Sequence, residues 1–238
     1  MSQENSETIM NTDDVLSMLD GLLEKWDSEW WDEFWKDKEK PVPFFTDLPD
    51  ENLVKYMSIC SDLNGKAMDI GCGNGRNARY LASNGFTVEG IDFSKECLDW
   101  AKEHKDHRSD IEYLNTSFFD IKKEHGTYDF IYDSGCLHHI KPHRRAQYLK
   151  KIFNLLKPGA YFGLVCFNDK GGASISDHDV YHKKSMSGGL GYSEEKLNKV
   201  LIPFFDIIEF REMEPGVEAQ SFGQDILWTV LLRKPEHH

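Results

Sequence analysis

A short stretch of the chain combines an acid and three glycines in a spacing that suits a nucleotide-like ligand. Asp69 stands just inside a predicted strand, and Gly71, Gly73 and Gly75 follow at alternate positions before a predicted helix. Glycine permits positive φ and close approach of a ligand to the backbone, and the N–H groups at a helix start favour negative charge. The sequence therefore predicts a ligand-binding turn here, although such turns also join strands to helices for structural reasons alone.

A second acid strengthens this prediction. Asp92 ends the next predicted strand, about 20 residues after the glycines, where a carboxylate can accept hydrogen bonds from ribose hydroxyls. Ser94 is better placed than Asp92 to cap the helix that follows. We therefore expect Asp92 to bind a ribose.

The residue after the glycines separates two classes of cofactor. A dinucleotide-binding turn has a third glycine where this chain has Arg76, and that glycine lets helix and strand approach each other beneath a pyrophosphate. Asp69 would repel a pyrophosphate but can lie beside an ammonium or sulfonium group. A cationic amino-acid cofactor fits better than NAD, and a nicotinamide-dependent oxidoreductase stays as an alternative.

Alternating strand and helix patterns place this turn in an α/β fold. Strands that alternate with helices imply right-handed crossovers and a parallel sheet, whereas the last two strands follow each other without a helix between them. We predict a Rossmann-like three-layer sandwich with a seven-stranded, mostly parallel sheet and an antiparallel C-terminal strand pair. The predicted strands are 66–70, 87–91, 111–114, 129–133, 161–167, 205–210 and 225–232, and the predicted helices are 77–83, 95–104, 143–156 and 193–201.

An aromatic segment precedes this domain and predicts a helical cover. Apolar residues recur at steps of three and four, which favours one helix capped by Asn11 or Thr12. The stripe consists of Leu16, Leu19, Leu23, Trp26 and Trp30. We expect Trp26 and Trp30 to pack on the domain, and Trp31 and Trp35, which lie off the stripe, to form a lid. Residues 168–191 are predicted to form a second mobile cover.

Composition limits the classes of partner. The formal net charge of −13 opposes binding to nucleic acid and favours a small-molecule partner. Five widely spaced cysteines without a CxxC pair indicate neither disulfides nor a zinc site, and no metal is expected. Without a secretory signal or a membrane segment the protein is expected to be soluble and cytoplasmic, as a monomer or homodimer. The expected division is a disordered start at 1–10, the cover at 11–48, the main domain at 49–235 and a possible tag remnant at 236–238.

Four segments, in order, resemble class I S-adenosylmethionine-dependent methyltransferases. Asp69 to Gly75 looks like the family's DxGxGxG motif, and Asp92 stands in its acidic ribose position. Asp129–Asp133 with Leu137-His138-His139 resembles the family's fourth strand and the segment after that strand, and Leu155–Ala160 resembles the turn before strand five. The likeness spans about residues 50–235. It implies methyl transfer from S-adenosylmethionine, which leaves S-adenosylhomocysteine.

The resemblance also implies a set of cofactor-binding residues. Asp69 would hold the amino group, Asp92 the ribose, and Phe93 would lie beside the adenine. Ser117 departs from the family, since many members have an acid there, so adenine recognition would rest on backbone groups and stacking of Phe118. The full set is Asp69, Gly71, Cys72, Gly73, Asn74, Gly75, Asp92, Phe93, Ser117, Phe118 and Asp133.

The acceptor site is expected at the ends of strands four and five, because ligands of open α/β sheets bind beyond the strands' carboxyl ends. Asp133 either positions a substrate amine or the cofactor, or caps its loop. His138 or His139 acts as a base or is packed against backbone. We take His138 and Asp133 as catalytic candidates. The candidates for substrate binding are Trp31, Trp35, His139 and Arg145.

A weaker resemblance points to the small-molecule branch that includes thiopurine and tellurite-resistance methyltransferases. It rests on Trp26–Trp35, Pro43-Phe44-Phe45 and Pro142–Arg145 followed by Tyr148. This branch would favour a thiol or another soft nucleophile as acceptor, methylated by direct displacement without a metal. A cofactor-binding sensor or scaffold without catalysis is the non-enzymatic alternative.

Overall fold

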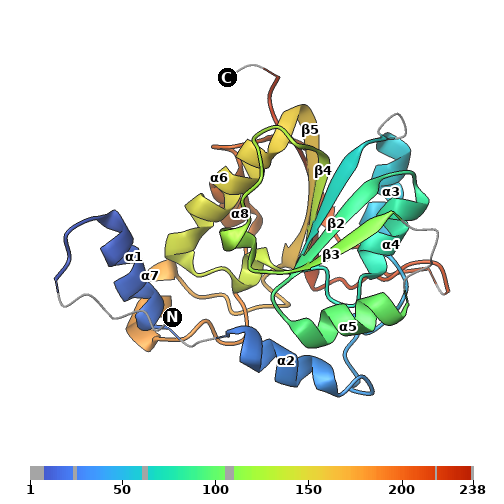
Figure 1. The fold of residues 1–238 in the computed structure, drawn as a ribbon. Coiled ribbons are helices and arrows are strands. Elements are labelled where there is room, and N and C mark those ends of the chain that lie inside the picture. The colour runs from blue at the N-terminus through green and yellow to red at the C-terminus, as the bar shows by residue number, and fades with distance from the viewer. Residues whose placement is uncertain (1–7, 24–25, 61–63, 105–109, 218, 237–238) are drawn as a thin grey trace.

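A seven-stranded sheet forms the centre of the molecule (Figure 1). In this computed structural model, residues 8–23, 26–60, 64–104, 110–217 and 219–236 are described. The strand order is β3-β2-β1-β4-β5-β7-β6, with the first five parallel and β7 antiparallel to both neighbours. The strands are β1 (Lys66–Ile70), β2 (Thr87–Asp92), β3 (Ile111–Asn115), β4 (Tyr128–Ser134), β5 (Leu156–Phe167), β6 (Asp206–Glu212) and β7 (Leu227–Arg233). The predicted fold class is confirmed.

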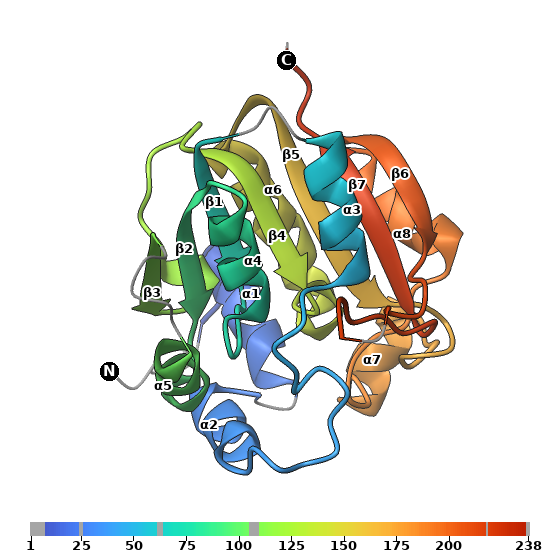
Figure 2. The same ribbon diagram turned by 90° about the vertical axis from the view of Figure 1, so that its right-hand side faces the viewer.

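Helices cover both faces of the sheet (Figure 2). They are α1 (Thr12–Gly21), α2 (Ser28–Lys36), α3 (Glu51–Ile59), α4 (Arg76–Ser83), α5 (Lys95–Glu103), α6 (Arg145–Leu155), α7 (Asp177–Lys183) and α8 (Glu194–Leu201), with the 3-10 turns η1 (Phe118–Asp120), η2 (Leu137–His139) and η3 (Pro142–Arg144). In both views α2 lies below the carboxyl ends of the parallel strands. Among the described residues, no helix is long and apolar enough to cross a membrane.

The two faces of the sheet bury separate cores because successive strand residues point to opposite sides. On β4, Ile131 packs in the core beneath α6 and α8, whereas Phe130 and Tyr132 pack in the core beneath α3 and α4. All three side chains are fully buried. Strands covered on both faces in this way need near-continuous apolar runs, and the carboxyl ends of β1, β2 and β4 are where polar residues interrupt those runs.

The N-terminal cover consists of two helices, so the prediction of one continuous helix is wrong. α1 begins with a capping box, in which the Asn11 side chain accepts from the Asp14 N–H. α2 begins at a second cap, where Asp27 accepts from the Trp30 N–H at 3.2 Å. Because Asp27 satisfies a free N–H group of a new helix start, the chain changes direction although the apolar stripe continues through it.

Two other boundaries also differ from the prediction. β5 already starts at Leu156, before Lys157-Pro158-Gly159, and the ladder with β4 tolerates this through a register shift between Tyr128 and Phe130. The predicted helix from residue 143 starts as η3 and becomes α-helical only at Arg145. The predicted disordered start falls mostly outside the described residues, as do His237 and His238 of the possible tag.

Candidate active site

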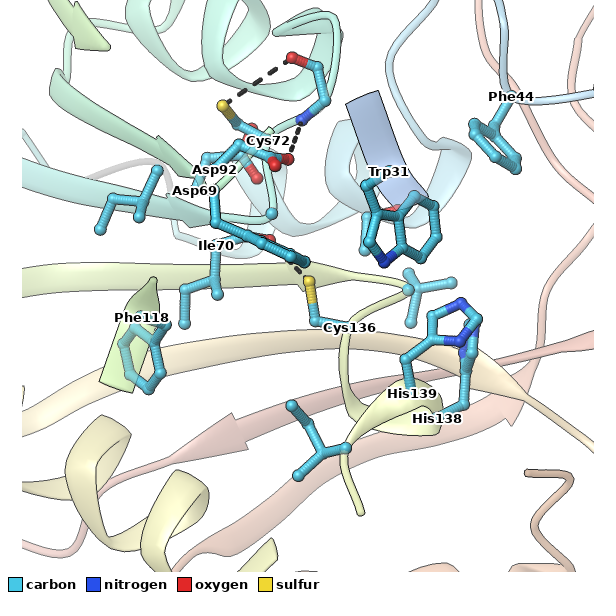
Figure 3. Close-up of a pocket in the computed structure, with 18 of the residues that line it drawn as sticks. Trp31, Phe44, Asp69, Ile70, Cys72, Asp92, Phe118, Cys136, His138 and His139 are labelled. Atoms are coloured by element: carbon cyan, nitrogen blue, oxygen red, sulfur yellow. Dashed lines mark hydrogen bonds between the residues drawn. The ribbon is translucent and has the colours of Figure 1, made fainter. Parts of the chain in front are cut away.

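A cavity of about 790 Å³ opens at the carboxyl ends of β1, β2 and β4 (Figure 3). Its walls come from the loop between β1 and α4, from the end of β2, from η1 and η2, and from α2 and the segment before β7. These elements are far apart in the sequence and meet only because parallel strands end at one edge of the sheet. The size suits a small-molecule site.

The glycine-rich turn forms one wall of this cavity. Gly71, Gly73 and Gly75 all adopt left-handed backbone conformations, with φ of 62°, 54° and 77°, which other residues rarely tolerate. A Cβ at Gly73 would lie 2.9 Å from Cη2 of Trp35. Gly71 and Gly73 line the cavity, while Gly75 is the N-cap of α4. The turn thus exposes its backbone to the cavity, and Trp35 of α2 lies next to it.

The other predicted residues of the turn have local partners. Cys72 is buried and its thiol lies 4.0 Å from the Gly73 carbonyl. Asn74 donates from Nδ2 to the Thr46 carbonyl at 2.9 Å and so ties the turn to the N-terminal cover. Both line the cavity. Both side chains therefore stabilise the conformation of the turn.

Asp69 lies in the cavity wall with an unsatisfied oxygen. The residue is 2% exposed and its Oδ2 has no hydrogen-bond partner. Burial raises the pKa of this carboxyl to about 8, against the opposing effects of Arg76 and of the Ala78 N–H. A buried, unpartnered carboxylate is costly, and a cationic group in the cavity would remove that cost. The site therefore fits a ligand that carries an ammonium group.

Asp92 is held in place by the backbone around it. Its Oδ2 accepts from the Gly73 N–H at 3.1 Å and its Oδ1 from the Ser94 N–H at 2.9 Å, while burial raises its pKa. Ser94 caps α5 by accepting from the Cys97 N–H. Each carboxylate oxygen can accept more than one hydrogen bond, so Asp92 can still accept hydroxyl groups from the cavity.

Aromatic and polar side chains form the wall next to Asp92. Phe93 is 36% exposed at the cavity, and Phe118 is buried edge-on against Tyr148. Ser117 also lines the cavity, but its Oγ accepts from the Phe119 N–H and starts η1. Sequence reasoning missed Asp120, an acid three residues after Ser117 that lines the same wall. The sequence could have indicated Asp120, because it is an acid three residues after Ser117, the position where many members of the resembled family have an acid.

Asp133 is not among the cavity-lining residues. Its Oδ1 accepts from the Cys136 N–H at 2.6 Å, and its Oδ2 accepts from the Leu137 N–H at 3.1 Å and the Tyr148 hydroxyl at 2.8 Å. Burial raises its pKa to about 7. The carboxylate of Asp133 thus caps the loop after β4, the alternative that the sequence left open, and its roles in catalysis and cofactor binding stay predictions.

The two adjacent histidines of η2 both line the cavity but differ in their partners. His138 stacks on Phe167 at 3.9 Å between ring centroids, and its Nδ1 accepts from the Phe167 N–H at 3.2 Å. Because a neutral imidazole has one N–H and one lone pair, this bond occupies the lone pair of His138. The prediction of His138 as a base is thus not supported by its hydrogen bonding.

Residues 67–159 match the methyltransferase domain family. The matched segment runs from β1 into β5 and includes the glycine-rich turn and Asp92. Within curated sequences this chain is similar to an uncharacterized methyltransferase of Synechocystis sp., with 31% identity over 121 residues that cover 51% of this chain and 53% of the relative. The matched segments span between about half and three fifths of the first curated relatives.

Solved structures share the fold of this chain. One, from a study of the conversion of a disulfide bond into a thioacetal group during echinomycin biosynthesis, has a TM-score of 0.69 at 22% identity and covers 89% of this chain and 93% of that chain. Another is Burkholderia thailandensis 1,6-didemethyltoxoflavin-N1-methyltransferase with bound 1,6-didemethyltoxoflavin and S-adenosylhomocysteine, with a TM-score of 0.60, 18% identity and coverage of 96% and 93%.

Arg145, which the sequence predicts to bind substrate, is not among the cavity-lining residues. Its Nη1 donates to Asp177 Oδ2 at 2.6 Å, and the guanidinium lies over the Tyr192 ring. The prediction that Arg145 binds substrate is therefore wrong in its placement, because the first turn of α6 directs the side chain towards α7. Its neighbour Arg144 lines the cavity instead.

The tryptophans of the cover divide differently from the prediction. Trp31 and Trp35 line the cavity, as a lid would, but so does Trp26. Trp30 is 45% exposed and does not pack on the domain as expected. Because α2 restarts at Asp27, the helical phase of the stripe is lost between Trp26 and Trp30, and periodicity across both could not assign their faces.

Proposed function

We propose that this chain transfers a methyl group from S-adenosylmethionine to a small-molecule acceptor. The observation that carries the proposal is the unpartnered Oδ2 of buried Asp69 beside the glycine-rich turn. This oxygen lacks a partner within the described part of the chain, and the amino group of the cofactor's methionine part would supply one. Asp92, in the same cavity, would accept the ribose hydroxyls.

The remaining cofactor contacts follow from the walls of the cavity. Gly71 and Gly73 would face the methionine part, and Phe93 and Phe118 would contact the adenine, with Ser117 beside them. The cofactor's sulfonium carries the electrophilic methyl group. The task of the chain is then to align acceptor and methyl group and to exclude water, for which the lid residues Trp31 and Trp35 are placed.

The acceptor would occupy the part of the cavity beyond the glycine turn. Aromatic side chains from the cover and the sheet line it, among them Trp26, Trp31, Phe44 and Phe167. A thiol or another soft nucleophile would suit these polarisable walls. This aromatic cover supports assignment to the thiopurine and tellurite-resistance branch, which stays part of the proposal.

Calorimetric titration of the purified protein with S-adenosylmethionine, S-adenosylhomocysteine and NADH tests the proposal. We expect roughly micromolar binding of both adenosyl compounds and none of NADH. Asp92→Ala should weaken this binding by about 1 to 3 kcal/mol, because the ribose hydroxyls lose their acceptor. Asp206→Ala, at an exposed acid that starts β6, should bind as the wild type does. Absence of binding by both adenosyl compounds would refute the proposal.

A further inference from the structure

His139 stands at the acceptor end of the cavity between two tryptophans of the cover. Its ring centroid lies 5.2 Å from that of Trp26 and 5.3 Å from that of Trp31, edge-on in both cases. Figure 3 shows His139 beside Trp31, and both residues line the cavity. The imidazole is thus held in the wall that an acceptor would contact.

Unlike that of His138, the side chain of His139 makes no hydrogen bond within the described part of the chain. Its Nδ1 is buried without a partner. Burial lowers the pKa of His139 to about 4, so the ring is neutral near pH 7 and keeps one nitrogen lone pair available. A buried polar ring without a partner is rare in folded proteins, and a ligand with a donor group would satisfy it.

The charged groups at this end of the cavity already have partners. Lys141 and Arg144 are engaged by Asp20, with Arg144 Nε donating to Asp20 Oδ2 at 3.1 Å. Arg76 pairs with Asp50 at 2.6 Å. Among the described residues, the acceptor end thus presents flat aromatic faces and the imidazole of His139, whose Nδ1 has no partner. Such walls suit a flat aromatic molecule, whose faces can pack against the tryptophan rings.

We propose that His139 is the general base of the transfer, and that the acceptor is a flat aromatic molecule whose nucleophile enters as a hydroxyl or ring N–H group. This inference rests on the proposed methyl transfer. The acceptor's X–H proton passes to Nδ1 of His139, the ring nitrogen that lacks a partner. The freed electron pair forms the bond to the methyl carbon, the carbon–sulfur bond breaks, and its electron pair stays on sulfur as a neutral thioether.

Two acceptors of one shape separate a base from a packing residue. At about pH 8, 2-naphthalenethiol is largely ionised in water, whereas 2-naphthol is protonated, because an aromatic thiol is the stronger acid. General base catalysis contributes about 10² to 10⁴-fold. We expect His139→Phe, which keeps a flat ring between Trp26 and Trp31, to lower kcat for 2-naphthol by about 10²-fold or more and kcat for the thiol by less than about threefold.

Two further variants serve as controls for this comparison. His139→Gln should show the same selective loss, so the test does not depend on how well one variant folds. His138→Asn keeps a hydrogen-bond acceptor near the Phe167 N–H. It should change kcat for 2-naphthol and kcat for the thiol by the same factor. S-adenosylmethionine affinity, measured by calorimetry, should be unchanged in the His139 variants.

Each contrary result has its own meaning. Equal losses for naphthol and thiol in the His139 variants would overturn the assignment of a base, because a packing role affects both acceptors alike. A wild-type protein that binds S-adenosylmethionine but methylates neither acceptor would overturn the inferred acceptor class. A protein that does not bind S-adenosylmethionine would instead refute the proposed function itself.

Discussion

At the scale of single residues, the site depends on backbone conformations that only glycine adopts easily. Gly73 has φ of 54° and faces Trp35, whereas Gly126 has a similar φ of 66° and a methyl group added there would meet nothing within 4 Å. The two positions share the conformational cost of a side chain, which is about 1 kcal/mol. They differ only in the space around them.

Gly73→Ala should therefore weaken S-adenosylmethionine binding by about tenfold or more, because the new methyl group displaces Trp35 and the turn together. Both variants should lose about 1 kcal/mol of unfolding free energy, because alanine replaces glycine at a positive φ. Gly126→Ala should nevertheless keep the wild-type affinity for S-adenosylmethionine. Calorimetric titration and urea unfolding of both variants measure the two quantities. Equal affinities in the two variants would remove the glycine turn from the binding site.

Residue spacing predicts the cofactor side of the cavity better than the acceptor side. Asp69 and Asp92 lie in the cavity as expected because each ends or nearly ends a parallel strand. Asp133 ends β4 in the same way, yet two N–H groups of its own loop and the Tyr148 hydroxyl occupy its carboxylate. Such competition depends on tertiary contacts, which a strand pattern does not contain.

At the scale of elements, an acidic residue attaches the first cover helix to the domain. α1 buries none of its residues, and Asp20 near its end contacts Lys141, His143 and Arg144. The Nδ1 of His143 lies 2.7 Å from the hydroxyl of Tyr181 in α7. The His143 ring thus connects α1 with the second cover, so both covers are anchored to one short segment beside the cavity.

Asp20→Ala should release α1 while leaving the sheet intact. We expect amide hydrogen exchange in residues 12–21 to accelerate by roughly fivefold, because the partly exposed ion cluster contributes on the order of 1 kcal/mol. Exchange in β1 and β4 should not change. Asp13→Ala, at an exposed acid of the same helix, provides the control. Equal exchange in the two variants would show that other contacts attach α1.

The helices and strands of the sheet domain are predictable from the sequence because each strand is bounded by turn residues. β1 matches its prediction at both ends, α5 begins after its predicted cap Ser94, and α8 begins one residue after its predicted start at Ser193. The cover is less predictable, since Leu16 to Trp30 keeps helical spacing across a break that only the Asp27 cap reveals. Local capping overrides periodicity there.

At the scale of the whole molecule, the enclosed edge of the sheet contains buried carboxyl groups whose ionisation lowers the stability of the fold. Burial raises the pKa of Asp69 to about 8 and that of Asp133 to about 7. The folded chain therefore holds protons that the unfolded chain has lost, and its stability falls as pH rises towards 8. His138 and His139 act in the opposite sense below about pH 6.5, because burial lowers their pKa values and the unfolded chain binds the protons.

In mildly acidic solution the carboxyl and histidine contributions to the free energy of unfolding offset each other. Above about pH 6.5 only the carboxyl contribution remains. The free energy of unfolding should accordingly change little between about pH 5 and pH 6.5 and then fall by about 1 to 3 kcal/mol by about pH 8. Urea unfolding at these pH values measures it. Asp69→Asn, which cannot ionise, should remove most of the fall, and an unchanged fall in this variant would show that Asp69 is not its source. Saturating S-adenosylmethionine should reduce the fall in the wild type as well, because a bound ammonium group would hold Asp69 in the ionised form that the empty cavity disfavours.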